Sequence, residues 1–350
     1  MKHYLPSDAA ITYMGRIDRS EPDAPAFYWA YSLFQFRFTG SAVRIMIRNH
    51  SYDAGNGNGL RLGAELDGKE SVLTLSPENG TEQTLTVTAE GTGTHSLRVW
   101  KREDGTHHFE LCGIAVSEGE TLSPLPLPAL KLEAFGDSVT AGSWVELCSR
   151  VGQLDEPDYT AKHDNARYSF AVLTADLLRA QIHLTAQGGL ALLDGSGYYE
   201  NGDVGMETAY DKLRYQPAAG RLTPWDFSRY IPDYVICAIG QNDHRVGGVE
   251  NVMPDTDAQE RWIGTYCRLL TDLMRKYPQA HFILTLTVLM HEEIWEKMAD
   301  TVCARMAGGR VHRLRFARSG RATPGHPRIP EQCEMAYELT RFIQTLIPSS

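Results

Sequence analysis

A serine that could act as a nucleophile lies in the motif GDSVTAG at residues 136–142, directly after an apolar run. A serine on a tight turn at the end of a strand exposes its hydroxyl and leaves its own backbone N–H free to donate, as acyl transfer requires. The motif differs from the G-x-S-x-G elbow of the α/β-hydrolases. The sequence therefore predicts that Ser138 attacks an ester carbonyl from a different kind of turn.

Three further short blocks follow apolar runs or precede the last helical segment: QGG at 187–189, GQND at 240–243 and HP at 326–327. Together with the GDS block, and in this order, they resemble the SGNH or GDSL hydrolase superfamily. The resemblance implies that His326 is the general base. It also implies an oxyanion hole formed by the Ser138 N–H, the Gly188 N–H and the Asn242 side chain. Gly189 is the alternative to Gly188.

The third member of the usual catalytic triad is absent from its expected place. The superfamily usually has an aspartate three residues before the histidine, and Thr323 occupies that position here. No carboxylate lies between Phe316 and Pro330. Either a backbone carbonyl orients His326, which gives a Ser-His dyad, or a carboxylate from elsewhere reaches it. We prefer the dyad, and we interpret the acidic stretch 151–165 as a long surface loop.

Weaker candidates for ligand contact are two tryptophans and one histidine. Trp144 and Trp225 could each cover the apolar face of a sugar ring. His291 follows a predicted strand at the edge where the catalytic blocks lie, so all three are predicted as possible cleft residues. The pair His107-His108 lacks further ligands at metal-binding spacing. We therefore predict no metal site and no cofactor.

Composition and charge argue against several classes of partner. The 350 residues carry a net charge of −10 with no basic run longer than two residues, which disfavours nucleic acid. The N-terminus has no apolar signal-peptide core, and no segment reaches the roughly 18 apolar residues of a membrane span. The six cysteines are dispersed without a C-x-x-C pair. We expect a cytoplasmic protein with no membrane partner, and the oligomeric state stays open.

The hydrophobic pattern that predicts the secondary structure differs between the two parts of the chain. Up to about residue 118, apolar and polar residues alternate in short runs, such as 34–38 and 43–47, between glycine-rich turns. This period of two predicts an all-β, jelly-roll-like sandwich at residues 1–120. The proline-rich segment 121–130 is predicted to be a stiff linker.

From residue 131 to residue 350, apolar runs alternate with amphipathic segments of helical length. Strands are predicted at 131–135, 182–186, 234–239, 282–286 and 311–316, and helices at 168–179, 258–276, 292–306 and 330–346. This alternation predicts an α/β SGNH-hydrolase domain with a central parallel sheet. Ligands of such sheets bind at the carboxyl ends of the strands, where the first three blocks lie.

The whole architecture resembles carbohydrate esterase family 2, in which a β-sandwich precedes an SGNH domain. The motifs YMGRID at 13–18 and FRFTGSAV at 36–43 support the resemblance. It implies a metal-free serine esterase that removes O-acetyl groups from plant-wall oligo- or polysaccharides such as mannan and xylan. Its partner would be an acetylated oligosaccharide. The alternatives are a lipid or thioester hydrolase of the SGNH type, or a non-catalytic carbohydrate-binding protein.

Overall fold

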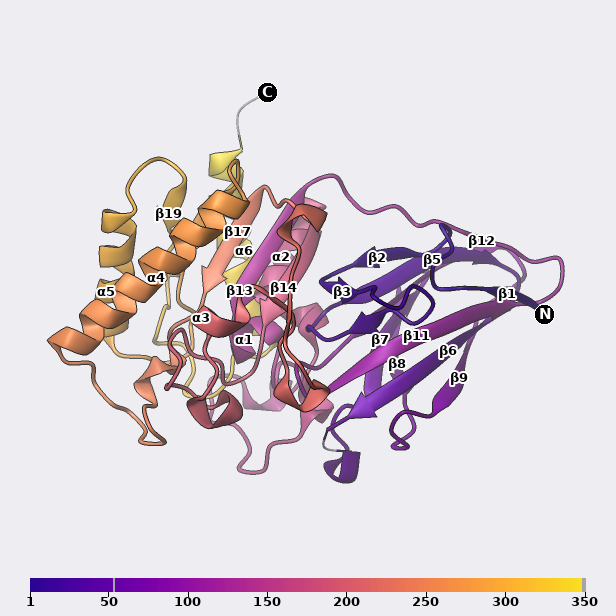
Figure 1. The fold of residues 1–350 in the computed structure, drawn as a ribbon, viewed down its shortest axis with the longest axis horizontal. Coiled ribbons are helices and arrows are strands. Elements are labelled where there is room, and N and C mark those ends of the chain that lie inside the picture. The colour runs from indigo at the N-terminus through magenta and orange to yellow at the C-terminus, as the bar shows by residue number, and fades with distance from the viewer. Residues whose placement is uncertain (53, 348–350) are drawn as a thin grey trace. The chain divides into compact units, whose positions relative to one another are not determined.

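The computed structural model describes residues 1–52 and 54–347, which form two compact units (Figure 1). The first unit comprises Met1–Leu127 with two short insertions from the later chain, Thr160–Lys162 and Leu213–Thr223. The second comprises the remaining described residues from Pro128 onward. Among the described residues, no helix has both the length and the apolar character that a membrane crossing needs.

The first unit consists of two antiparallel β-sheets, so the predicted N-terminal sandwich is confirmed. One sheet has the order β3-β4-β11-β6-β9 with β1 also paired to β11, and the other has the order β12-β5-β10-β7-β8 with β2 paired to β5. The strands are β1 (Lys2–Tyr4), β2 (Thr12–Met14), β3 (Ile17–Asp18), β4 (Ala26–Phe27), β5 (Leu33–Thr39), β6 (Ala42–Ser51), β7 (Arg61–Leu66), β8 (Lys69–Thr74), β9 (Glu82–Thr88), β10 (Thr94–Lys101), β11 (His107–Val116) and β12 (Leu122–Ser123).

Alternation along the strands explains the core of this unit. In β6, Val43, Ile45 and Ile47 point inward and are fully buried, while Arg48 and His50 lie on the outer face and are only partly buried. Because successive strand residues point to opposite faces, one periodic sequence supplies both the core and a polar surface. The segment 121–130, predicted as a linker, begins with a short strand. Its residues Leu122 and Ser123 form β12, which pairs with β5 before the first proline of the segment.

The second unit has a five-stranded parallel sheet in the order β14-β13-β17-β18-β19, as predicted. The strands are β13 (Lys131–Gly136), β14 (Gln181–Ala186), β17 (Tyr234–Ala238), β18 (His281–Leu284) and β19 (Val311–Arg313). Chain order reverses at β13, because its partners β14 and β17 follow it in sequence on opposite sides. A reversal of this kind leaves a crevice at the carboxyl ends of the strands, where ligands bind.

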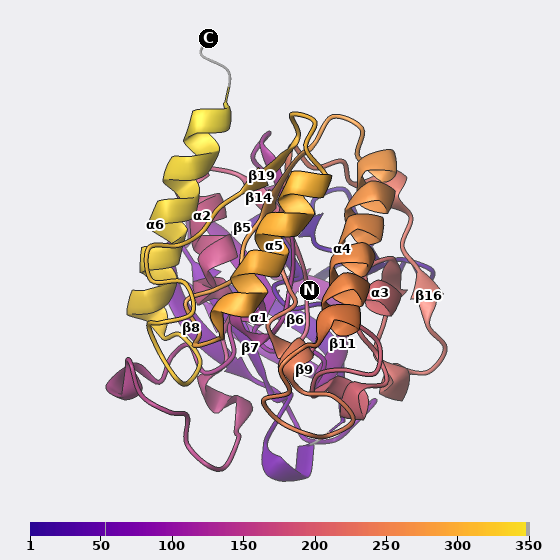
Figure 2. The same cartoon turned by 90° about the vertical axis from the view of Figure 1, so that its left-hand side faces the viewer.

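Helices cover both faces of the parallel sheet. They are α1 (Ser138–Ala141), α2 (Phe170–Leu178), α3 (Met206–Ala209), α4 (Thr256–Lys276), α5 (Glu293–Arg305) and α6 (Ile329–Leu346), and a two-stranded ribbon is formed by β15 (Lys212–Arg214) and β16 (Thr223–Pro224). Figure 2 shows α2 beside α6 on one side of the sheet and α4 beside α5 on the other. Each pair covers one face, as the strand and helix alternation requires.

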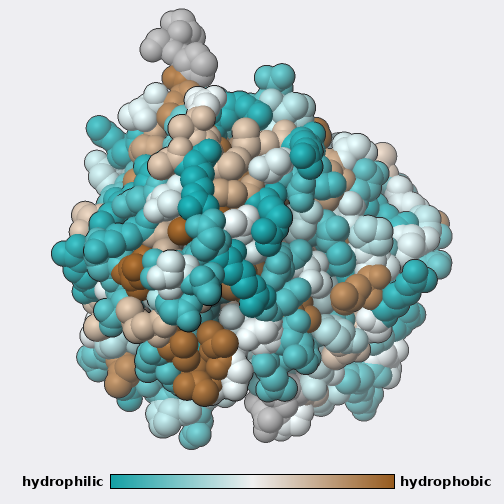
Figure 3. Space-filling model, turned by 60° about the vertical axis from the view of Figure 1, so that its left-hand side comes forward, coloured by the Kyte–Doolittle hydropathy of each residue, from teal (hydrophilic) through white to brown (hydrophobic). Residues whose placement is uncertain are grey.

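The long helix α4 shows how the sequence specifies this packing. Its N-cap residue Asp255 accepts a hydrogen bond from the Ala258 N–H, and its last turn carries Arg275 and Lys276, which favour the negative end of the helix dipole. Trp262 lies on its buried face. The face of the molecule seen in Figure 3 is mainly hydrophilic with scattered apolar patches, as expected where amphipathic helices cover a sheet.

Candidate active site

Ser138 is the first residue of α1, directly after the carboxyl end of β13. Asp137 caps this short helix, because its carboxylate accepts a hydrogen bond from the Val139 N–H at 3.0 Å. The cap turns the chain sharply where strand β13 becomes helix α1. The serine therefore stands at the edge of the sheet where the crevice is expected.

His326 lies just before α6 and reaches Ser138 as predicted. Its Nε2 is 2.8 Å from the Ser138 Oγ, within hydrogen-bond distance, although 188 positions separate the two residues. A nucleophile and a base in such contact are the pair that serine acyl transfer requires.

The carboxylate that orients His326 comes from Asp155, in the loop after α1. Its Oδ2 lies 2.6 Å from His326 Nδ1, and its Oδ1 accepts the His326 backbone N–H at 3.0 Å. The preferred prediction of a Ser-His dyad oriented by a backbone carbonyl is therefore wrong, and the alternative of a carboxylate from elsewhere holds. Thr323, at the usual aspartate position, is buried, and its carbonyl accepts the Met290 N–H instead.

Arg328 holds this carboxylate in place from a fully buried position. It donates one hydrogen bond to Asp155 Oδ1 at 2.6 Å and another to the His326 carbonyl at 2.7 Å. Burial raises the pKa of Asp155, but the hydrogen bonds and charges of His326 and Arg328 outweigh burial and bring it to about 2. An ionised carboxylate only accepts hydrogen bonds, so Nδ1 carries the hydrogen and the Nε2 lone pair faces Ser138.

Gly325 makes the approach of the Asp155 loop possible. A Cβ atom at position 325 would lie 2.5 Å from the Gln153 carbonyl oxygen and 2.7 Å from the Asp155 backbone nitrogen. Any larger residue would push the loop away. Asp155 was not predicted as a site residue, because an acidic surface loop has no periodicity. One sequence feature could have indicated a carboxylate from elsewhere in the chain. Arg328 is a cation two residues after His326, in a segment that contains no carboxylate of its own.

The predicted oxyanion donors lie after the two strands that flank β13. Asn242 follows β17, and its side-chain Nδ2 donates to the Leu190 carbonyl at 3.0 Å, which leaves its second N–H for a ligand. Gly188 and Gly189 follow β14. Gly189 has a φ of 74°, and a Cβ there would lie 2.8 Å from the Tyr198 Cβ, so it is required as a turn glycine. Because the turn itself accounts for the glycine at position 189, we prefer Gly188 as the donor.

Asp243, next to Asn242, organises the loops around the donors. Its carboxylate accepts the Leu192 and Leu193 N–H groups at 2.8 and 3.0 Å. Burial raises the pKa of Asp243 to about 7, although these hydrogen bonds oppose the shift. The residue ties the loop after β14 to the loop after β17, which carry the proposed donors.

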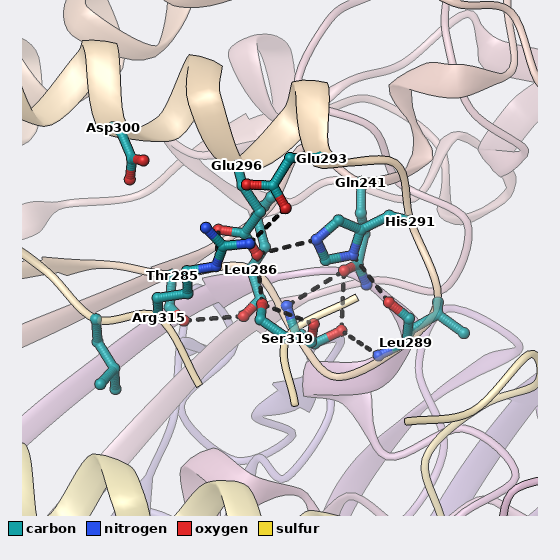
Figure 4. Close-up of polar contacts among 12 residues, drawn as sticks. Gln241, Thr285, Leu286, Leu289, His291, Glu293, Glu296, Asp300, Arg315 and Ser319 are labelled. Atoms are coloured by element: carbon teal, nitrogen blue, oxygen red, sulfur yellow. Dashed lines mark hydrogen bonds and ion pairs between the residues drawn. The ribbon is translucent and has the colours of Figure 1, made fainter. Parts of the chain in front are cut away.

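His291 does not line a cleft, contrary to the prediction. Its side chain is 2% exposed, and its ring nitrogens face the Leu289 carbonyl at 2.8 Å and the Glu296 carboxylate at 3.0 Å. Figure 4 shows Glu296 also receiving the Ser319 hydroxyl. The predicted cleft residue is therefore part of a buried polar cluster that holds the loop after β18.

The two tryptophans are also buried, which contradicts their prediction as open sugar platforms. Trp144 is 3% exposed and packs edge-on against Tyr159, with the Arg328 guanidinium 6.0 Å from its ring. Trp225 is 5% exposed and lies under the Arg229 guanidinium at 4.8 Å. Stacking on a sugar requires an open aromatic face, and neither ring provides one.

Comparisons with known proteins agree with this architecture. The family model for the carbohydrate esterase 2 N-terminal domain matches residues 13–126. The acetylxylan esterase / glucomannan deacetylase of Cellvibrio japonicus is 30% identical over 234 residues, which are 65% of this chain and 61% of the relative. The cellulase/esterase CelE of Acetivibrio thermocellus is 27% identical over 348 residues, 95% of this chain and 39% of the relative. The chain thus spans less than two thirds of either relative.

Among solved structures, a family two carbohydrate esterase from Cellvibrio japonicus has the same fold. Its TM-score is 0.81 at 23% identity, and the match covers 99% of this chain and 97% of that chain. The fold and the arrangement of Ser138, His326 and Asp155 are those of an SGNH/GDSL-like protein with an N-terminal β-sandwich. Within that class, residues 13–126 match the N-terminal domain of carbohydrate esterase family 2, and the chain is similar to proteins of that family. Members of this family are carbohydrate acetyl esterases.

Proposed function

We propose that this protein is a serine esterase that removes O-acetyl groups from acetylated mannan or xylan oligo- or polysaccharides. The observation that carries the proposal is the continuous contact from Ser138 through His326 to Asp155. The substrate class is supported by the similarity to a Cellvibrio japonicus protein described as an acetylxylan esterase and glucomannan deacetylase.

In the acylation step, Ser138 Oγ attacks the acetyl carbonyl carbon while His326 Nε2 takes the hydroxyl proton. Asp155 stabilises the imidazolium that forms and keeps its Nδ1–H pointing away from the serine. The His326 proton then passes to the sugar oxygen, the C–O bond of the ester breaks, and the deacetylated sugar leaves. The enzyme retains the acetyl group on Ser138.

Negative charge on the tetrahedral oxygen falls between three N–H donors: the Ser138 backbone, the Gly188 backbone and the Asn242 side chain. Donors of this kind are preorganised and need no rearrangement as the charge develops. Losing one costs roughly 2.7–4 kcal/mol of transition-state stabilisation, so Asn242→Ala should slow turnover by two to three powers of ten.

In the deacylation step, His326 removes a proton from water, and the resulting hydroxide attacks the acetyl carbonyl carbon. The tetrahedral intermediate collapses to acetate, and Ser138 recovers its proton from His326. The reaction consumes one water and releases one acetate and one sugar hydroxyl. Its atoms balance without a metal or cofactor.

The test is acetate release from acetylated manno- and xylo-oligosaccharides by the wild type and by Ser138→Ala. NMR of each product reads which acetyl positions remain. Ser138-dependent release supports the esterase and identifies its regiochemistry. Folded wild-type protein that releases no acetate from either substrate overturns the proposal. Turnover of long-chain acyl esters alone would instead assign a lipid hydrolase, and glycan binding without any turnover would assign a binding protein.

A further inference from the structure

A second cluster of chemistry-bearing side chains lies on the sandwich, among residues that the esterase mechanism does not use. His50 belongs to β6, while His108 and Glu110 belong to β11, and these strands are neighbours in one sheet (Figure 1). The three residues offer ligand atoms that all lie within 4.8 Å of one another. Within the described part of the chain, this is the one such group of three or more His, Cys, Asp or Glu side chains.

The strand register explains why these side chains meet. His108 is directly opposite His50, and Glu110 is directly opposite Arg48, two residues before His50. Residues that are opposite or diagonal on one face of an antiparallel pair lie within side-chain reach. The two imidazole rings are parallel, with centroids 4.4 Å apart. The cluster is therefore built by the regular ladder and depends on no loop.

Each residue of the cluster offers one ligand atom that lies within 4.8 Å of the ligand atoms of the other two. Glu110 Oε2 pairs with Arg48 at 2.5 Å, while Oε1 lies 3.7 Å from His50 Nε2. That His50 nitrogen is buried and has no hydrogen-bond partner among the described residues. His108 Nδ1 contacts the Tyr52 hydroxyl at 2.5 Å. A tyrosine that receives the Nδ1–H would leave the His108 Nε2 lone pair free.

We propose that His50, His108 and Glu110 bind a zinc ion on the outer face of the sandwich. Two imidazoles and one carboxylate are a ligand set that Zn²⁺ prefers, with water as the fourth ligand. The Tyr52 contact to His108 and the Arg48 contact to Glu110 would orient the ligands, as outer partners do in zinc sites. Ligand bonds of about 2.0–2.1 Å require the three side chains to close around the ion.

The ion would join the end of β6 to the start of β11, next to the loop that follows β6. Its expected effect is therefore stabilisation of the sandwich, and the proposal does not rest on esterase activity. An ordinary ion pair between Glu110, His50 and Arg48 is the competing explanation. The two explanations differ in one measurable property, which is affinity for zinc.

The experiment titrates the whole chain, first treated with a chelator, with zinc chloride in a calorimeter and in a thermal-unfolding assay. We expect one zinc per chain with a micromolar Kd, and a rise in Tm of about 5 °C at a hundredfold excess over Kd. His108→Gln and Glu110→Gln should each weaken binding at least tenfold. Cobalt(II) should give the visible d–d bands of a tetrahedral site in the wild type and lose them in His108→Gln.

Two histidine variants elsewhere serve as matched controls. His312 contacts His281 at 2.9 Å, which gives a second stacked histidine pair, and His326 contacts Asp155. His312→Gln and His326→Gln should bind zinc as the wild type does. The proposal is overturned if the folded wild type binds no zinc at 100-fold excess over protein, if either His108→Gln or Glu110→Gln binds zinc like the wild type, or if a control variant removes the binding.

Discussion

Two clusters in the second unit contain the same chemical parts and differ in how they are connected. In the catalytic cluster, Ser138 contacts His326, and His326 contacts Asp155, in line. In the loop cluster, Ser319 and His291 both direct their polar hydrogens to Glu296 (Figure 4). An arginine completes each cluster, Arg328 in the first and Arg313 in the second.

The same three residue types are therefore connected in two ways, and only in the first does the histidine lie between the serine and the carboxylate. His291 has an oxygen acceptor at each ring nitrogen, so it has no position from which to take a serine proton. His326 turns one nitrogen to the carboxylate and the other to the nucleophile. Exposure follows the same division, because the His291 and Glu296 side chains are 2% and 1% exposed, whereas those of His326 and Asp155 are 23% and 24% exposed.

Exchanging each serine for alanine tests this comparison most strongly. Ser138→Ala should lower kcat by roughly a millionfold, because it removes the nucleophile. Ser319→Ala should leave kcat/KM nearly unchanged and lower the free energy of unfolding by about 1–3 kcal/mol, because a buried acceptor loses a partner. Acetate release and chemical denaturation measure the two quantities. A large loss of activity in a stable Ser319→Ala protein would contradict the division of roles.

The carboxylates give the next largest contrast. Asp155→Asn should lower kcat/KM about ten-thousandfold, because the amide no longer favours the correct imidazole tautomer, and it should also lower Tm, because the buried Arg328 loses its carboxylate partner. Glu296→Gln should destabilise the fold by about 3 kcal/mol, because it leaves charged partners buried. Folded Glu296→Gln protein should keep its rate. If Asp155→Asn retains wild-type kcat/KM, the dyad was the better interpretation after all.

A glycine gives a third contrast between the two clusters, because Gly325 packs against the Asp155 loop of the catalytic cluster. Gly325→Ala should displace the Asp155 loop and lower kcat/KM about a hundredfold, since a shift near 1 Å is enough for such a loss. Gly308 is the matched control, because a Cβ there meets only the Met306 carbonyl oxygen at 3.9 Å. Gly308→Ala should have wild-type kinetics. Equal rates for the two variants would show that the close approach is unimportant.

The smallest expected effect is on acid stability. Burial raises the pKa of Glu296, but its hydrogen bonds to His291 and Ser319 and the charge of Arg313 outweigh burial and lower it from 4.5 to about 2. Between those values the unfolded chain binds more protons than the folded one, so stability falls as the pH decreases through this window. We expect a loss of roughly 2 kcal/mol from this group.

Urea unfolding at a series of pH values between 2 and 7 measures this loss. Glu296→Gln should flatten the curve below about pH 5, because the variant has no group to titrate there. Asp155→Asn should flatten it less, since that carboxyl starts from the lower ordinary pKa of 3.8 and its side chain is more exposed. An unchanged curve in Glu296→Gln would show that other carboxyl groups govern acid unfolding.

Much of the catalytic unit was predictable from the sequence. The predicted strand 131–135 corresponds to β13 at Lys131–Gly136, and the predicted helix 258–276 to α4 at Thr256–Lys276. Parallel strands present their carboxyl ends at one edge, so the blocks that follow β13, β14 and β17 had to meet there. The contact between Ser138 and His326 agrees with this reasoning.

Other features depended on contacts that no sequence pattern records. Asp155 reaches His326 from a loop without periodicity, and its approach depends on the space left by Gly325 and on the cation of Arg328. Burial also reversed the interpretation of Trp144, which follows Ser138 closely in sequence, and of His291, which follows strand β18, because neither side chain has an open face.

Local sequence patterns were enough to predict most strands and helices and the sheet edge at which Ser138 lies, because hydrophobic periodicity and turn residues act over a few residues. The carboxylate beside His326 and the residues opposite His108 depend on the fold, because a loop path and a strand register are set by long-range packing. The same physical difference explains why Asp155 could not be identified and why the pair His107-His108 gave no sign of His50.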